Sequence, residues 1–218
     1  MCKILRLGRC PLFRLIAILL FAALPAQADS NVTIFPKTIS ADCFGGRAIS
    51  YDECGFQRDL FDRALRAANK ADKRLLIVYG AEWCIWCHVF KEHIKGKSGE
   101  FHYKLEGRDG YRMDELATLK DVEMATTLSA FVEKTFVVVN IEGQHSFDGY
   151  NVLDHTGASD HIGQTIPYIF TVDKNGSFLA DMPTAIENKA LEKRREGVDW
   201  YRGYNRSELM KELVLLAG

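Results

Sequence analysis

The stretch Trp83-Cys84-Ile85-Trp86-Cys87 follows closely on an apolar run, Leu75-Leu76-Ile77-Val78-Tyr79. The apolar run predicts a buried strand, and apolar side chains return at helical spacing over residues 84–94. The sequence has no further cysteine pair spaced as zinc ligands would be. Two cysteines separated by two residues at a strand-to-helix junction therefore predict a pair that cycles between dithiol and disulfide.

The N-terminus predicts export. A basic head is followed by an apolar core at 15–24 and by the small residues Ala26-Gln27-Ala28. This is the pattern of a cleaved signal peptide over residues 1–28, with cleavage near Ala28. An uncleaved anchor is the alternative, but the apolar core is short for a bilayer. We expect a periplasmic or secreted protein in an oxidising compartment.

Charge and cysteine count narrow the function classes further. The formal net charge of −1 gives no indication of a nucleic-acid or membrane-surface partner. Two of the six cysteines fall in the signal peptide. The remaining four are an even number, and proximity in the sequence favours a structural disulfide Cys43–Cys54 beside the pair Cys84–Cys87.

Periodicity predicts an α/β domain over 56–218 behind an N-terminal extension at 29–55. The expected helices are 56–71, 84–94, 118–134 and 207–216, and the expected strands are 75–80, 136–141, 166–172, 177–180 and 199–202. Insertions are expected near 95–117 and 181–198. We expect a long polar loop at 143–164 and an exposed helix or loop in the charged run 187–196.

The region 56–218 resembles the thioredoxin superfamily, and most closely its exported branch. The resemblance rests on Trp83-Cys84-x-x-Cys87 after a strand, on Ile166-Pro167 at the start of a later strand, and on the hairpin turn Asp173-Lys174-Asn175-Gly176. It implies a thioredoxin-like fold, in which a central mixed β-sheet is flanked by helices, and a thiol–disulfide oxidoreductase.

The resemblance also implies roles for individual residues. Cys84 is the expected nucleophile, because a helix N-terminus favours its thiolate, and Cys87 is the resolving thiol. Pro167 is expected in cis, leaving nearby backbone free to pair with a substrate strand. The expected substrate-binding residues are Trp83, Trp86, Ile166 and Pro167.

No metal and no cofactor beyond the redox-active disulfide is expected. The expected partners are exported proteins with cysteines and a membrane or soluble redox partner.

Two departures from the family pattern bear on mechanism. Val78 and Val138 stand where thioredoxins commonly have a buried acid and its lysine, so the proton of Cys87 must leave through water or another side chain. Trp86 replaces the histidine of strongly oxidising relatives, which favours a reductase or isomerase. His88 opposes this effect, because a protonated ring on the same helical face as Cys84 would stabilise its thiolate.

Several other interpretations stay open. Cys84–Cys87 is alternatively a structural disulfide, or, since His88 completes a CxxCH motif, a haem attachment site. Cys43–Cys54 is alternatively a second redox pair that relays electrons. A non-catalytic binding or chaperone module would use the same groove. The histidines and aspartates at 145–161 are interpreted as a solvated loop rather than a metal site.

Overall fold

The structure is a computed structural model that describes residues 31–98, 100–105, 111–116, 122–182, 191–196 and 199–218. The signal peptide expected at 1–28 lies outside these residues. Within them, no helix has the length and apolar character needed to cross a membrane.

The described residues form five helices and nine strands, with short 3-10 turns between some of them. The helices are α1 Gln57–Lys70, α2 Ile85–Ile94, α3 Val122–Thr135, α4 Gly149–Thr156 and α6 Arg206–Ala217. The strands are β1 Ile34–Phe35, β2 Arg74–Gly80, β3 Glu100–Leu105, β4 Tyr111–Leu116, β5 Phe136–Glu142, β6 Tyr168–Val172, β7 Phe178–Asp181, β8 Leu191–Glu196 and β9 Asp199–Tyr204.

The central sheet has five strands in the order β1-β5-β2-β6-β7. β2 pairs in parallel with β5, from Arg74 opposite Phe136 to Gly80 opposite Glu142. On its other side β2 pairs antiparallel with β6, and β6 pairs antiparallel with β7. A mixed sheet with this order, flanked by helices, is the thioredoxin-like fold that the resemblance implies.

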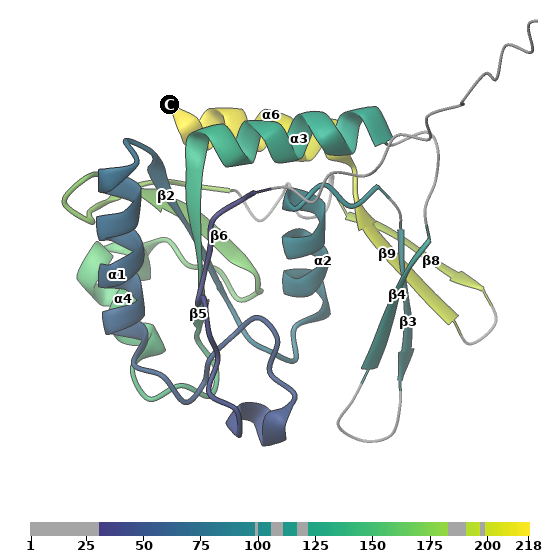
Figure 1. The fold of residues 1–218 in the computed structure, drawn as a ribbon, viewed down its shortest axis with the longest axis horizontal. Helices are drawn as coiled ribbons and strands as arrows, with labels where there is room; N and C mark the ends of the chain where they lie inside the picture. The colour runs from purple at the N-terminus through teal and green to yellow at the C-terminus, as the bar shows by residue number, and fades with distance from the viewer. Residues whose placement is uncertain (1–30, 99, 106–110, 117–121, 183–190, 197–198) are drawn as a thin grey trace, which may run out of the picture.

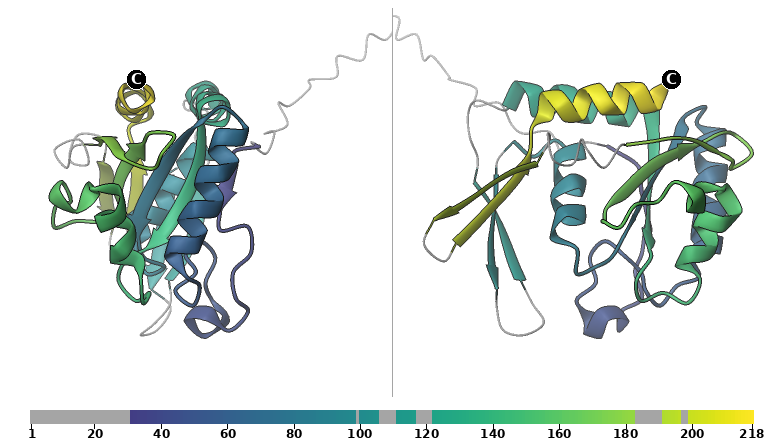
Figure 2. Two further views of the ribbon diagram at one scale, coloured as in Figure 1. Left: turned by 90° about the vertical axis from the view of Figure 1, so that its left-hand side faces the viewer. Right: turned by 180° about the vertical axis from the view of Figure 1, so that it is seen from behind.

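Helices cover both faces of the sheet, as Figures 1 and 2 show. Side chains of a strand alternate between faces, so β2 contributes to two cores. Leu75, Ile77 and Tyr79 pack in the cluster that includes α1 and α4. Leu76 and Val78 pack in the cluster that includes α2, α3 and α6. This double burial explains why the sequence of β2 is continuously apolar.

A second sheet of four strands, in the order β4-β3-β9-β8, stands beside α2 (Figure 1). It brings the two expected insertions together, because β9 pairs antiparallel with β3 of the first insertion and with β8 of the second. The expectation of an exposed helix or loop at 187–196 is wrong for its described part, because 191–196 is strand β8 paired with β9. The charged sequence of β8 lacks apolar alternation. Its strand conformation is therefore determined by pairing with β9 and not by a local sequence pattern.

The expectation of an uninterrupted polar loop at 143–164 is also wrong. It contains α4 and a 3-10 turn at Ala158–Asp160. α4 begins at Gly149, where a Cβ atom would overlap the carbonyl oxygen of Glu142. A glycine is required for this close approach, and it also weakened the helical signal in the sequence.

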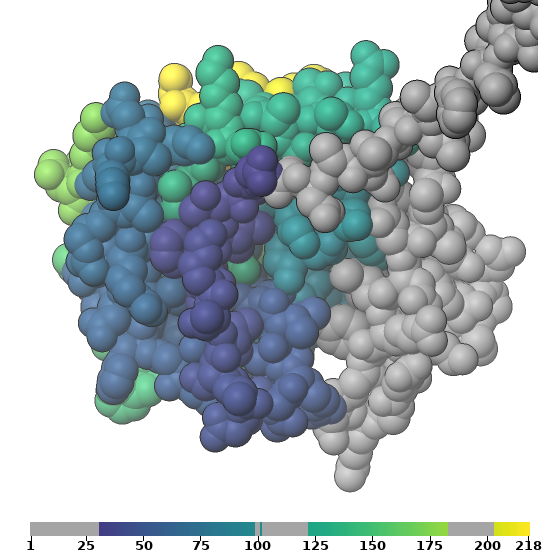
Figure 3. All heavy atoms as spheres, in the orientation of Figure 1, coloured from purple at the N-terminus to yellow at the C-terminus, as the bar shows by residue number. Residues whose placement is uncertain are grey.

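The N-terminal extension lies along the domain rather than apart from it. β1 pairs in parallel with the edge of β5, with Ile34 opposite Val138. Figure 3 shows the extension, in purple, running down one face of the molecule. The predicted disulfide Cys43–Cys54 is present, with a Cα–Cα separation of 5.8 Å. It closes a loop that contains residues 49–51, which contact the candidate site.

Candidate functional site

The Cys84–Cys87 pair lies at the junction between β2 and α2. Cys84 has extended backbone angles at the N-cap of α2, and its Sγ accepts the backbone N–H of Cys87 at 3.2 Å. The two residues form a disulfide, and both side chains are buried. The Cys87 N–H and the positive end of the helix dipole both face Cys84 Sγ, which is the setting that favours a thiolate.

The fold brings most of the predicted site residues together. Ile166 and Trp86 pack against the small cluster that holds both cysteines. The Ile166–Pro167 peptide bond is cis, and β6 begins at the next residue, opposite Tyr79 of β2. Trp83 is 47% exposed and is the aromatic side chain of the motif that faces solvent.

Trp86 has a different environment from the one expected of a substrate-binding residue. It is half-buried, and its ring packs edge-on against Tyr204 at the end of β9, with ring centroids 5.7 Å apart. Tyr204 Oη also donates a hydrogen bond to the carbonyl oxygen of Trp86 at 3.3 Å. Trp86 therefore joins the CxxC motif to the second sheet.

Val78 and Val138 are both buried in the apolar core. Two buried carboxylates lie near the motif: Glu82, two residues before Cys84, and Glu142, which contacts Glu82. Glu142 accepts the backbone N–H of Glu82 at 2.9 Å and also the N–H groups of Gln144 and His145. Burial raises the pKa of both carboxyl groups, and their hydrogen bonds to backbone N–H groups oppose that shift.

The Glu82 carboxylate holds the N-terminal extension against the motif. It accepts three consecutive backbone N–H groups, from Ile49 at 2.9 Å, Ser50 at 3.0 Å and Tyr51 at 2.8 Å. Charge-assisted bonds of this kind are about twice as strong as neutral ones. The residue just before Trp83 thus fixes a segment more than thirty positions upstream. An acidic residue directly after a buried strand was the available sequence signal for this contact.

His88 is buried and does not meet the condition for stabilising a thiolate at Cys84. Desolvation lowers its pKa to about 4, so its ring is neutral at pH 7. Its Nε2 lies 2.6 Å from the carbonyl oxygen of Glu82, and its Nδ1 lies 3.1 Å from Ser50 Oγ. The proposed modulation by a protonated His88 is therefore not supported by its surroundings.

A chain of hydrogen bonds assigns the His88 tautomer. The Lys91 ammonium has only donors, and it donates to Ser50 Oγ at 2.6 Å. The Ser50 hydroxyl then donates to His88 Nδ1, and Nε2–H donates to the Glu82 carbonyl. These contacts tie α2 to the same segment of the extension that Glu82 holds.

The residues do not fit a haem attached through CxxCH. An axial ligand needs an accessible ring nitrogen, and both nitrogens of His88 are engaged with protein groups in a buried setting. The two cysteine sulfurs are buried against Tyr51 and Ala81.

The histidines of 145–161 do not converge on a common point in the described chain. The His155 ring packs against Phe61, and the His161 ring stacks on Phe178 with centroids 4.1 Å apart. Within the described residues, one group offers metal-ligand geometry, Cys43, Asp52 and Cys54. The sulfurs of that group are joined in a disulfide.

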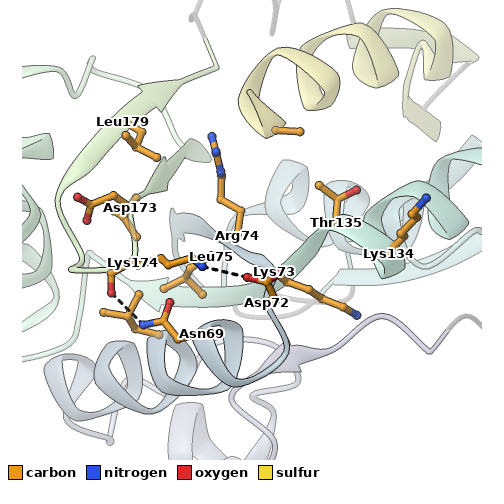
Figure 4. A pocket seen from close by; sticks show the side chains of 13 residues that line it. Asn69, Asp72, Lys73, Arg74, Leu75, Lys134, Thr135, Asp173, Lys174 and Leu179 are labelled. Atoms are coloured by element: carbon orange, nitrogen blue, oxygen red, sulfur yellow. Dashed lines mark hydrogen bonds and ion pairs between the residues drawn. The ribbon is translucent and has the colours of Figure 1, made fainter.

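A cavity of about 590 Å³ lies at the opposite end of β2 from the cysteines (Figure 4). Cationic groups that line it bind neighbouring protein atoms: Lys174 pairs with Asp72 at 2.9 Å, and Arg74 donates to the carbonyl oxygen of Leu216 at 3.1 Å. These contacts join the turns and helix ends at the start of β2. The cavity is separate from the disulfide site.

No protein-family model and no curated protein matches the chain. Among solved structures, the chain is similar to the crystal structure of disulphide isomerase from Xylella fastidiosa Temecula1. The identity is 21%, the match covers 60% of this chain and 76% of that chain, and the TM-score is 0.38.

Proposed function

We propose that this protein is an exported thiol–disulfide oxidoreductase that acts on cysteines of other exported proteins. One observation carries the proposal: Cys84 caps α2 with its sulfur on the Cys87 N–H, in a disulfide packed beside Ile166. A structural disulfide has no need of a helix N-terminus, whereas a nucleophilic thiolate gains from one.

The chemistry follows from the placement of the two sulfurs. In the reduced protein, the Cys84 thiolate attacks a client disulfide, and one client sulfur leaves as a thiolate. Cys87, three residues further along α2, then attacks Cys84 Sγ in the mixed disulfide. The second client sulfur leaves with the electron pair, and the Cys84–Cys87 disulfide forms. The client is reduced by two electrons, and a redox partner must reduce the protein again.

The surroundings favour a reductase or isomerase direction. Trp86 places no imidazole beside the sulfurs, and the neutral ring of His88 is hydrogen bonded to Ser50 and Glu82. Neither Trp86 nor the neutral His88 thus gives the Cys84 thiolate the cationic neighbour that makes a disulfide strongly oxidising. With less stabilisation of the reduced form, the disulfide form is favoured and the protein is a better electron donor.

Clients would bind at the exposed face of the motif, where Trp83 offers an apolar contact surface. Ile166 packs against the cluster that holds both cysteines. A non-catalytic binding module would use this same face, so reactivity of Cys84 has to be tested directly. The expected signal peptide places clients and redox partner in the periplasm or outside the cell.

Trapping in the native host tests the proposal. Cys87→Ala removes the resolving thiol, so clients should remain on Cys84 as mixed disulfides that a reductant releases. Cys84→Ala is the matched control and should trap nothing. Absence of reductant-sensitive adducts on Cys87→Ala would count against an oxidoreductase and in favour of the binding module.

A further inference from the structure

The side chain of Tyr51 lies against the resolving cysteine. Tyr51 is 1% exposed and packs in one cluster with Cys84 and Cys87. Its Oη and Cys87 Sγ approach the same glycine: a Cβ atom on Gly80 would stand 2.8 Å from Oη and 2.6 Å from Sγ. Gly80 therefore leaves the space in which the phenol and the sulfur lie next to each other.

The resolving step needs such a neighbour. Cys87 is 1% exposed, and a thiolate in that position is costly unless a donor stabilises it. Val78 and Val138, both buried, provide no polar group at the base of the motif. A tyrosine hydroxyl is a hydrogen-bond donor that keeps its proton at neutral pH.

We propose that the Tyr51 hydroxyl donates a hydrogen bond to the Cys87 thiolate after reduction, and so stabilises and aims the resolving nucleophile. This inference rests on the proposed oxidoreductase function. The thiol proton of Cys87 leaves to solvent, and Tyr51 retains its own. Cys87 Sγ then bonds to Cys84 Sγ, the bond from Cys84 to the client sulfur breaks, and the client leaves as a thiolate.

The N-terminal extension has the contacts needed to hold Tyr51 in this place. Glu82 accepts the backbone N–H of Tyr51 and those of the two residues before it. Asn140 of β5 donates to the carbonyl oxygen of Ser50 at 3.2 Å, and the Cys43–Cys54 disulfide closes the loop that contains Tyr51. The extension thus supplies a side chain to the redox site in addition to covering it.

Stopped-flow kinetics separate the two half-reactions. The mature chain is reduced only until the Cys84–Cys87 pair opens, as checked by alkylation and mass spectrometry. It is then mixed with an aromatic disulfide that releases a coloured thiolate at each step. The first release reports attack by Cys84 and the second reports resolution by Cys87. Wild type is compared with Tyr51→Phe and with a control, Tyr79→Phe, which also removes a buried hydroxyl. In wild type, Tyr79 Oη donates a hydrogen bond to the carbonyl oxygen of Gly143.

Tyr51→Phe should leave the first release within about twofold of wild type and slow the second about tenfold or more, as expected for loss of a hydrogen bond to a charged group. The pH midpoint of the second release should move up by about one unit. Tyr79→Phe should resemble wild type. Equal second-phase rates in wild type and Tyr51→Phe, or equal slowing of both phases, would overturn the role of Tyr51. A wild type that releases no thiolate would instead overturn the proposed function.

Glu82→Gln gives a second test that keeps the phenol. It weakens the acceptor for three N–H groups, so Tyr51 should be held less firmly and the second release should slow. Since both changes act on one contact, the Tyr51→Phe/Glu82→Gln double variant should be little slower than Tyr51→Phe alone. Fully multiplicative effects of the two substitutions would contradict a shared contact.

Discussion

The carboxylate of Glu82 accepts the backbone N–H of Tyr51 at 2.8 Å, so the residue next to Trp83 holds the N-terminal extension at the disulfide. The extension is therefore part of the site's structure. Tyr51 of the extension packs in one cluster with both buried cysteines, whereas Trp83 of the motif is 47% exposed. The motif therefore combines a buried disulfide with an exposed aromatic side chain.

Removing the Cys43–Cys54 disulfide should destabilise the protein through this extension. The pair is separated by 11 positions, and a loop of about that size contributes on the order of 3 kcal/mol in the chain-entropy account. Urea unfolding of Cys43→Ser/Cys54→Ser should therefore show a free energy of unfolding lower by about that amount. If the variant matched wild type in stability but lost turnover, the pair would be a redox relay instead of a structural link.

Gly80→Ala should disturb the site by overpacking. The new methyl group would stand 2.6 Å from Cys87 Sγ and 2.8 Å from Tyr51 Oη, and such insertions typically cost about 1–3 kcal/mol. Thermal unfolding should show a lower Tm. Gly203→Ala is the control, because the nearest atom to its Cβ is His93 Nε2 at 3.8 Å. Equal Tm values for the two variants would contradict the close approach at Gly80.

His88 should make stability depend on pH between about 4 and 6.5. Burial lowers its pKa in the folded protein to about 4 from 6.5, so the unfolded chain binds more protons in this window. Its contribution is complete above pH 6.5 and is lost as the pH falls towards 4, on the order of 3 kcal/mol in all. The difference in unfolding free energy between wild type and His88→Gln should shrink over that range. An NMR titration that placed the ring's pKa near 6.5 would contradict this prediction.

Asp148 should stabilise the start of α1. Its carboxylate accepts the N–H of Gln57 at 2.9 Å and that of Arg58 at 3.0 Å, from a buried position. Removing a side chain that caps the first N–H groups of a helix costs about 1–2 kcal/mol, so Asp148→Ala should lower the unfolding free energy by that amount. Asp154→Ala, at an exposed position on α4, should change it by less than about 0.5 kcal/mol.

The central fold could be predicted from sequence because its elements carry local signals. The apolar run of β2, the CxxC motif at the start of α2 and the Ile166-Pro167 pair each indicate their structure within a few residues. In the second sheet, the local pattern predicts a strand at 199–202, within β9. The pairing of β9 with β3 spans about a hundred residues, so no local signal indicates it. The place of Tyr51 was missed for the same reason, since a tertiary contact with Glu82 determines it.

An equilibrium redox titration of the Cys84–Cys87 pair tests the central claim most directly. The mature protein is equilibrated in thiol–disulfide buffers of graded potential, trapped by alkylation and analysed by mass spectrometry. A reversible two-electron transition of this pair is expected, with the same midpoint from the reducing and the oxidising side, while Cys43–Cys54 stays closed over that range. A Cys84–Cys87 disulfide that stays closed until the protein unfolds would contradict the account, because a structural link behaves in that way.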